Sequence, residues 1–449
     1  MIESFSDNTF LAILIVISGF LAFGMMLFSP KLHRVIFAVY IFVFLAAYDF
    51  IGYNPALTSP IKIYFADGIL LFMAVLAFQV LFRQISFRRL QSPITLLLFV
   101  NFVFGIVAVA IGLFVGNSAN DVLGDFRRFF LYPLVALYVL SIPIKWSGLK
   151  KLVIIFGFAL LILSIGAFIR FATGTSWDPE QFNPTGQFRA IGYFSGILVS
   201  MGVGVLYAIS MHSHRYRKFF SLVIMLVFEA VLFASGYRLL WVAGIFVPLF
   251  VAYFSSRGLQ KGLRPLVIGV VILVLLAGLI SFARSFFPDI YYRLTDRLYT
   301  GAYNFDFSNN TRYYAWTTAW SKFLSSPIVG VGIGDQFQYI TIDSKGGYII
   351  SNSTTHNVLM SLLYQTGVLG AGLFLLVQIT FTIYVWRGLS KIESRARIPL
   401  IGMLAGYFSA LMMGMVQPTF EAPGAIVMFY LWMGLILNIF RMFTSKAHD

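Results

Sequence analysis

A histidine followed by an asparagine, His356-Asn357, stands where a polar tract meets a long apolar segment. Thr354 or Thr355 is a suitable N-cap for the helix that this segment predicts, which places His356 in the first helical turn. The positive end of the helix dipole disfavours imidazolium, so we expect a neutral imidazole that can act as a base near pH 7. The alternative is a structural histidine, the more common role of a single histidine at a span entrance.

Two arginines could bind an anion on the side of the membrane where we expect His356. Arg238 lies on a turn of two or three residues between two predicted spans, and Arg189 precedes another span. Guanidinium groups donate paired hydrogen bonds to phosphate oxygens. The alternative is that each arginine reaches toward lipid headgroups. We favour function, because the positive-inside rule disfavours arginine on a short outer turn.

Four more arginines are predicted on the same side, namely Arg127, Arg128, Arg170 and Arg312. Arg312 lies on an expected surface helix, where arginine is common. Arg127 and Arg128 have Asp121 and Asp125 nearby, so local ion pairs explain them as well as substrate binding does. Arginines without matching carboxylates at an interface nevertheless favour an anionic ligand.

The elements that position these residues are predicted membrane helices. Of the 449 residues, 59% are hydrophobic and only 11% are charged, whereas about a quarter of a soluble domain is charged. Many apolar runs exceed the length of about 18 residues that spans a bilayer. We therefore predict an all-α polytopic membrane protein, with residues 1–449 forming a single transmembrane domain.

We expect about 12 to 13 transmembrane helices. Their predicted ranges are 10–28, 35–51, 61–82, 94–115, 127–144, 150–171, 190–211, 218–237, 239–255, 264–283, 357–386, 398–416 and 423–443. The first range is expected to be a retained span, because no Lys or Arg precedes it and a secretory signal needs a basic start.

Basic residues predict the orientation. Most of the 32 Lys and Arg fall in alternate short loops that carry few acidic residues, and such loops remain in the cytoplasm. This predicts a protein of the bacterial cytoplasmic membrane with its N-terminus outside, its C-terminus in the cytoplasm and its active site on the outer side. The same rule explains the net charge of +15 without nucleic acid as a partner.

Residues 285–355 form the one sizeable extramembrane segment and are predicted to lie outside. Helical spacing predicts short interfacial helices at 289–299 and 311–324. In the second helix we expect Tyr313, Trp316, Trp320 and Phe323 along one stripe. The glycine-rich turn at 330–335 lacks the Lys-Ser/Thr of a P-loop, so we interpret it as a turn that lets the backbone pass close to another element.

The sequence predicts no metal and no cofactor. Cysteine is absent, the five histidines are scattered, and no HExxH pattern occurs. Asp67 and Glu229 are the main acids within predicted spans. Pairing inside the helix bundle explains them as well as a proton or ion path does.

Several of these residues together resemble the O-antigen ligase/polymerase family of bacterial membrane glycosyltransferases. The residues that carry the resemblance are Arg189, Ser235, Arg238, Arg312, Trp316, the run 325–334, His356, Asn357, Gly367 and Gly370. The resemblance covers roughly residues 185–375. The bulky neighbours of Arg238 and the thirteenth span depart from the family's pattern.

The resemblance implies a donor glycan on undecaprenyl diphosphate, an acceptor that is a glycan or lipid A core, and the lipid bilayer as surroundings. It leaves open a chain-length regulator as a further partner. It implies that Arg189 and Arg238 hold the diphosphate and that His356 positions or deprotonates the acceptor hydroxyl. The expected substrate-binding residues are Arg312, Arg127, Arg128, Asn357, Tyr313 and Trp316.

Two questions of function stay open at this point. A polymerase and a ligase need the same donor site, so the sequence does not separate them. A flippase or other transporter of polyprenyl-linked glycans is the alternative from another class. A transporter should show charged residues at the bilayer midplane and repeated halves, and the sequence shows neither.

Overall fold

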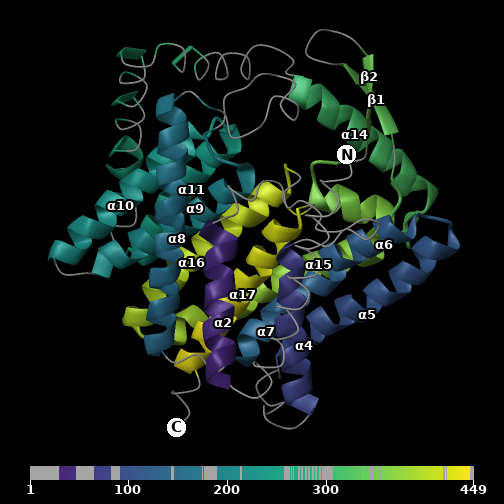
Figure 1. Ribbon diagram of the computed structural model, residues 1–449, viewed down its shortest axis with the longest axis horizontal. Coiled ribbons are helices and arrows are strands. Elements are labelled where there is room, and N and C mark those ends of the chain that lie inside the picture. The colour runs from purple at the N-terminus through teal and green to yellow at the C-terminus, as the bar shows by residue number, and fades with distance from the viewer. Residues whose placement is uncertain are drawn as a thin grey trace, which may run out of the picture.

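The computed structural model describes a set of helices with one small hairpin above them (Figure 1). The described residues are 30–46, 65–81, 92–142, 146–173, 175, 190–212, 215–256, isolated positions between 263 and 295, 307–336, 338–342, 348–352, 355–417, 420 and 422–444.

The first half of the described chain is helical throughout. Its elements are α2 (Pro30–Ala46), η1 (Phe65–Asp67), α4 (Gly68–Leu81), α5 (Pro93–Phe114), α6 (Ala119–Phe126), η3 (Arg127–Leu131), η4 (Tyr132–Leu134), α7 (Val135–Ser141), α8 (Trp146–Thr173), α9 (Tyr193–His212), α10 (Arg215–Ala234) and α11 (Arg238–Ser255).

The second half adds two strands to its helices. Its elements are α14 (Phe307–Ser325), β1 (Gln338–Ile342), β2 (Tyr348–Asn352), α15 (Val358–Gly388), η6 (Leu389–Lys391), α16 (Ser394–Gly414) and α17 (Pro423–Thr444). The strands pair antiparallel with Ile340 opposite Ile350, a hairpin that the helical patterning of the sequence did not predict.

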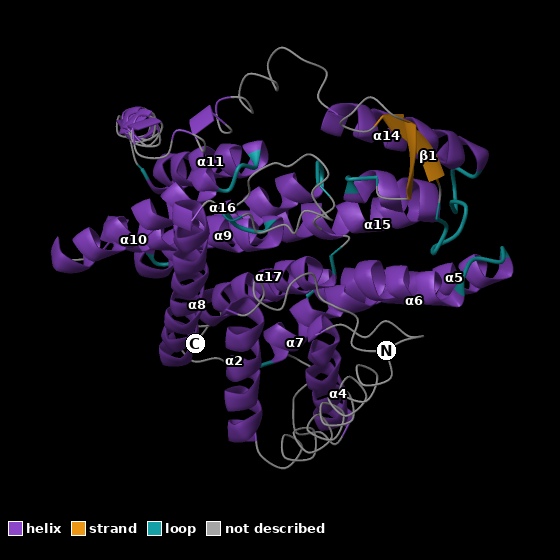
Figure 2. Ribbon diagram, turned by 45° about the horizontal axis from the view of Figure 1, so that its top comes forward, coloured by secondary structure: helices purple, strands orange, loops and turns teal. Residues whose placement is uncertain are grey.

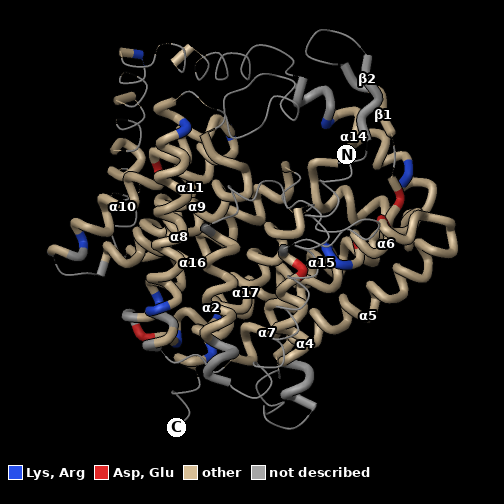
Figure 3. The backbone as a smooth tube through the Cα atoms, in the orientation of Figure 1, with Lys and Arg blue, Asp and Glu red and all other residues tan. Residues whose placement is uncertain are grey.

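The prediction of an all-α polytopic membrane protein is confirmed. Within the described ranges, seven helices are long and apolar enough to cross a membrane. Figure 3 shows the Lys and Arg of these helices mainly near helix ends, with long uncharged stretches between them. The predicted span 10–28 lies outside the described residues. The predicted span 127–144 is a continuous run of short helical segments, from η3 through η4 to α7, and Pro133 in η4 has no backbone donor.

Helices α9 and α16 pack against each other at the centre of the bundle (Figure 2). Gly204 and Gly402 face each other so closely that a Cβ on Gly204 would lie 2.4 Å from the Gly402 carbonyl oxygen. Small residues allow such backbone approach between membrane helices. The buried hydroxyls of Ser200 and Ser409 meet at 3.1 Å in the same interface. This contact sets the position of α9, on which α10 and α11 pack.

Helix α15 is tied to α16 and α17 by one buried amide. Gln378 accepts a hydrogen bond from the Tyr407 hydroxyl at 2.5 Å and donates one to the Tyr430 hydroxyl at 3.2 Å. Both side-chain dipoles of Gln378 are thereby satisfied in the buried interior. The amide therefore fixes the rotation of α15 relative to the two C-terminal helices.

The predicted helix at 311–324 is confirmed as α14, and two of the four aromatic residues of the predicted stripe lie outside its buried face. Tyr313 and Trp320 are 64% and 48% exposed. The buried face instead carries Ala315, Ala319 and Phe323, which pack against Tyr339 of β1 and Tyr364 of α15. Alanine lets the α14 backbone approach these tyrosine rings closely, which larger side chains at the same positions would prevent.

Helix α15 is broken at Gly367, and the glycine-rich turn fills the break. Gly367 has φ 63 and ψ −164, so the carbonyl groups of Tyr364 and Gln365 lose their helical partners. The backbone amides of Val331 and Gly332 donate to these carbonyl oxygens at 2.9 and 3.0 Å. The interpretation of this turn as a close backbone passage is confirmed, and we call this set of contacts the α15 clamp.

After the break, the direction of hydrogen bonding is reversed, and α15 donates to the segment that precedes the glycine-rich turn. The amide of Val368 donates to the Pro327 carbonyl at 2.9 Å, and a Cβ at Gly367 would lie 2.2 Å from the Ile328 carbonyl oxygen. Gly330, with φ 74, would meet Gln365 backbone atoms at a similar distance. Gly367 and Gly330 must therefore both lack a side chain.

Replacing Gly367 with alanine should destabilise the protein by at least about 2 kcal/mol, because the Cβ would clash with fixed backbone at a positive φ. Thermal unfolding in detergent measures the effect. Gly372→Ala is the matched control, since a Cβ at Gly372 in the same helix meets nothing within 4 Å. Equal unfolding temperatures for the two variants would contradict a rigid α15 clamp.

Candidate functional site

His356 has a strained backbone immediately before α15. Its φ is 52, and it is the one residue other than glycine with a positive φ in the described part of the chain. Such a conformation costs a residue with a Cβ roughly 1–2 kcal/mol. Strain of this kind persists only where surrounding contacts hold it, and it is concentrated at functional sites. The backbone thus singles out the same residue as the sequence.

Asn357, not Thr354 or Thr355, is the N-cap of α15, so the predicted cap is wrong. The Asn357 side-chain oxygen accepts hydrogen bonds from the amides of Leu359 at 2.9 Å and Met360 at 3.1 Å. Its short amide side chain therefore satisfies two of the free donors at the helix start. As a result, His356 precedes the cap instead of lying in the first helical turn.

Thr355 is unable to cap the helix because its own groups are engaged elsewhere. It is 1% exposed, and its hydroxyl lies 2.6 Å from the Ser361 hydroxyl. Its carbonyl oxygen accepts a hydrogen bond of 2.6 Å from the Trp316 indole on α14. Two separate helices therefore anchor the residue before His356, and the Asn357 cap anchors the residue after it.

Trp316 acts in the structure as part of this anchor. Its indole N–H donates to the Thr355 backbone and its ring packs with the α14 core that contacts α15. Tyr313, three positions earlier, is 64% exposed and its ring meets the Tyr314 ring edge-on. Contact of Tyr313 or Trp316 with a sugar stays a prediction.

The His356 imidazole is held neutral. Burial, and then the charge of Arg312, lower the pKa of His356 from its usual 6.5 to about 4. The sequence argument assigned the neutral form to the helix dipole, whereas burial and a neighbouring guanidinium are the causes here. A neutral ring can accept a hydrogen bond from a hydroxyl at physiological pH.

Arg312 lies on α14, whose position depends on the turn below it. Lys322 donates to the Asp335 carboxylate at 2.6 Å, and the Tyr364 hydroxyl donates to the Asp335 carbonyl at 3.1 Å. These bonds connect α14, the glycine-rich turn and α15. Together with the α15 clamp, these bonds hold α14 in the position that places the charge of Arg312 beside His356.

Arg127 and Arg128 are both engaged in ion pairs. Arg127 contacts Asp67 at 2.8 Å, and the Tyr132 hydroxyl donates to the other Asp67 oxygen at 2.6 Å. Arg128 pairs with Asp125. Pairing in the bundle, one of the two explanations of Asp67, is confirmed, whereas the buried Glu229 carboxylate has no hydrogen-bond partner among the described residues. Substrate binding by Arg127 and Arg128 stays a prediction.

Asp125 is a residue whose role the sequence did not reveal. Besides Arg128, this buried carboxylate accepts the Gly334 amide at 2.9 Å and the Gln365 side-chain amide at 2.7 Å. It thereby joins α6, the glycine-rich turn and the clamped start of α15. The only signal in the sequence was its spacing of three residues from Arg128, which is typical of a local ion pair.

Arg238 begins α11 directly after the tight turn that the sequence predicted. The Tyr237 amide donates to the Ser235 hydroxyl at 3.2 Å, and Gly236 supplies a positive φ of 73. As the first residue of an 18-residue helix, Arg238 stands where backbone donors and the helix dipole favour an anion.

Arg189 lies outside the described residues, but the segment that follows it does not. Ala190 and Ile191 are buried. The Tyr193 ring at the start of α9 meets the Tyr237 ring at 4.9 Å, edge to face. The start of α9 and the residue before Arg238 are therefore neighbours in space. Figure 2 shows α11 on the same upper side of the molecule as α14.

The candidate site thus consists of two parts. His356, Asn357, Arg312 and Trp316 are gathered at the junction of α14 and α15, which packs against α5. Arg238 belongs to the group of α9, α11 and α16. Within the described ranges, no group of three His, Asp or Glu side chains is arranged to hold a metal ion.

A comparison with protein families matches residues 220–375 to the O-antigen ligase family. The matched range contains Arg238, Arg312, His356 and the α15 break, whereas Arg127, Arg128 and Arg189 precede it. This match confirms the resemblance found in the sequence. None of the curated proteins compared with the chain matches it.

Replacing Arg312 with glutamine should raise the pKa of His356, because the substitution removes a neighbouring positive charge. The pKa should stay below about 6.5, since burial is the larger cause. Histidine NMR titration in detergent measures the shift, with Arg387→Gln at the far end of α15 as control. An unchanged pKa in the Arg312 variant would contradict the contact.

Because the folded pKa of His356 lies below the unfolded value, lowering the pH from about 6.5 toward 4 should destabilise the wild type.

Proposed function

From the O-antigen ligase match over residues 220–375, we propose that the protein is a membrane glycosyltransferase that uses a glycan on undecaprenyl diphosphate. The match supports the broader class, an O-antigen ligase/polymerase-type membrane glycan enzyme. The donor, the outer face of the cytoplasmic membrane as the place of reaction, and independence from metal ions belong to the proposal.

The observation that carries the proposal is the state of His356. The residue is strained, held at both neighbours, and neutral beside a guanidinium. A neutral imidazole next to a fixed positive charge can accept a proton from a hydroxyl while an anion binds alongside it. The strained backbone is the kind of feature that functional sites retain.

In the proposed reaction, the acceptor hydroxyl oxygen attacks the anomeric carbon of the donor sugar. The bond between that carbon and the diphosphate oxygen breaks, and its electron pair leaves with the diphosphate. The acceptor proton passes to the His356 imidazole. Arg238 and Arg189, with Arg312, stabilise the charge that develops on the leaving group.

Donor binding would also adjust the base. The diphosphate brings negative charge next to Arg312, which offsets the charge that lowers the pKa of His356. The imidazole therefore becomes a stronger base when the donor is present. This coupling would limit proton transfer to the loaded enzyme.

The acceptor decides between the two members of this class. A polymerase would extend a lipid-linked glycan, and a ligase would transfer it to lipid A core or another acceptor. The site described above serves both, because both use the same donor. A chain-length regulator would act only with the polymerase.

The broken helix α15 is the feature that would favour a transporter, since transporters bind substrates at the free backbone groups of interrupted helices. Here the Tyr364 and Gln365 carbonyls at the break accept hydrogen bonds from the glycine-rich turn. These groups are therefore occupied by the protein itself, and we favour the enzyme.

The deciding experiment uses purified protein in liposomes with an undecaprenyl-diphosphate oligosaccharide and mass spectrometry of the products. His356→Ala and Arg238→Ala should each lower transfer by about 100-fold or more, because each removes a group used in the transition state. His212→Ala, at the C-terminal end of α9, is the control and should remain active. Chelation with EDTA should change the rate little.

Near wild-type transfer by the His356 and Arg238 variants would overturn the site, provided that circular dichroism shows them folded. Movement of the donor between leaflets without any product would favour the transporter instead. A strong requirement for divalent ions would contradict the metal-free mechanism.

The orientation has a separate test. A reporter fused after Lys345, in the large segment, should be active on the outer side, because the basic loops are expected in the cytoplasm. A matched fusion after Lys446 should report the cytoplasm. The reverse pattern would remove His356 from the side where the donor is proposed.

A further inference from the structure

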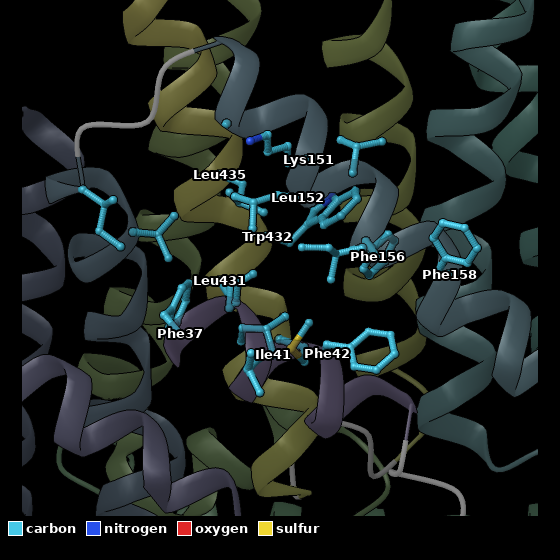
Figure 4. A pocket seen from close by; sticks show the side chains of 18 of the residues that line it. Phe37, Ile41, Phe42, Lys151, Leu152, Phe156, Phe158, Leu431, Trp432 and Leu435 are labelled. Atoms are coloured by element: carbon cyan, nitrogen blue, oxygen red, sulfur yellow. The ribbon is translucent and has the colours of Figure 1, made fainter. Parts of the chain in front are cut away.

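An apolar crevice of about 770 Å³ lies away from the candidate site, between α2, α7, α8 and α17 with contributions from α9 and α16. Figure 4 shows Phe37, Ile41, Phe156, Leu431 and Trp432 directed into it. The volume is within the range of about 300–1,000 Å³ that is typical of small-molecule sites. The crevice is therefore large enough for a substantial part of a lipid chain.

The lining has one charged residue, Lys151, among otherwise apolar side chains and one glycine. The indole N–H of Trp432 donates to the Met403 carbonyl at 2.9 Å and is thus not available to a ligand. Lys151 lies at one end of the group in Figure 4. An occupant would therefore have a long apolar part and one anionic group.

The position of Lys151 relative to the membrane supports a lipid. The apolar span of α8 runs from Lys151 to Thr173, so Lys151 marks the point where that helix leaves the hydrocarbon. Arg170, near the other end of the helix, donates to the Ala190 carbonyl close to the start of α9. Lys151 and Arg170 are roughly 28 Å apart along the helix. Because the start of α9 also contacts Tyr237, the neighbour of Arg238, Lys151 lies on the opposite side of the bundle from Arg238.

The crevice is also accessible from the membrane. Val35 and Val39 of α2 and Phe158 of α8 line it and are 58%, 56% and 60% exposed. In a membrane-spanning bundle these apolar side chains face lipid. A chain could enter sideways between α2 and α8 without crossing a polar barrier.

We propose that this crevice binds an anionic phospholipid, with its phosphate on Lys151 and an acyl chain along Phe37, Phe156 and Leu431. Lys150 adjoins Lys151 in the sequence and Lys145 precedes it by six residues, on the side that the basic loops assign to the cytoplasm. The cytoplasmic leaflet is rich in anionic lipid, which a lysine near its surface attracts. The bound chain would complete the packing between α2 and α17.

Native mass spectrometry of the full-length protein in detergent tests the proposal, with phosphatidylglycerol and phosphatidylcholine of identical chains added in equal amounts. The wild type should retain phosphatidylglycerol about five-fold better, as expected for one lysine at the headgroup. Lys151→Ala should remove this preference. Lys391→Ala, which likewise lies at the end of a span, should keep it.

A second variant tests the crevice independently of charge. Ala38→Phe on α2 adds volume to the lining and should reduce retention of both lipids. Equal retention of the two lipids by the wild type, or an unchanged preference in Lys151→Ala, would overturn the proposal. Displacement of phosphatidylglycerol by an equimolar polyprenyl phosphate would also overturn it, because the occupant would then be a different lipid.

Discussion

The hydrogen bonds between the glycine-rich turn and the broken start of α15 hold the candidate site to the membrane helices. Val331 and Gly332 donate to carbonyl groups that the break at Gly367 releases. Unpaired backbone carbonyls inside a membrane protein are costly, so the break and the turn depend on each other. The contact adds to the Trp316–Thr355 hydrogen bond and to the packing of α14 on Tyr364, which also hold α14 against α15.

The geometry around His356 follows from that contact. Asp125 extends it by binding the turn and Gln365 together, and Trp316 extends it from α14 to the Thr355 carbonyl. His356 is therefore confined from several directions while its own backbone stays strained. A site built on such connected elements is preorganised, which is what stabilisation of a charged transition state requires.

Polar and charged side chains occupy different parts of the helix bundle. Inside the bundle, Gln378 and the Ser200–Ser409 pair join helices through short hydrogen bonds. At one side of the bundle, Arg238 begins α11, and Arg312 lies beside the candidate base. At the other side, Lys151 ends an apolar crevice. A single helical framework thus carries basic side chains at both ends.

The sequence by itself determined the helical membrane fold, most helix bounds, the turn before Arg238 and the family resemblance. These features depend on local hydropathy and on motifs, which a chain carries along its length. It also singled out His356 and Arg312 as candidates, but not their contact.

Only the tertiary structure decided which residue caps α15, how Trp316 is used and what Asp125 joins. Thr355 and Asn357 are both good caps by residue type, and the choice depends on Ser361 and Trp316, which occupy the groups of Thr355. Asp125 and Gln365 are 240 positions apart. No local pattern contains such a contact, because it exists only after the helices have packed.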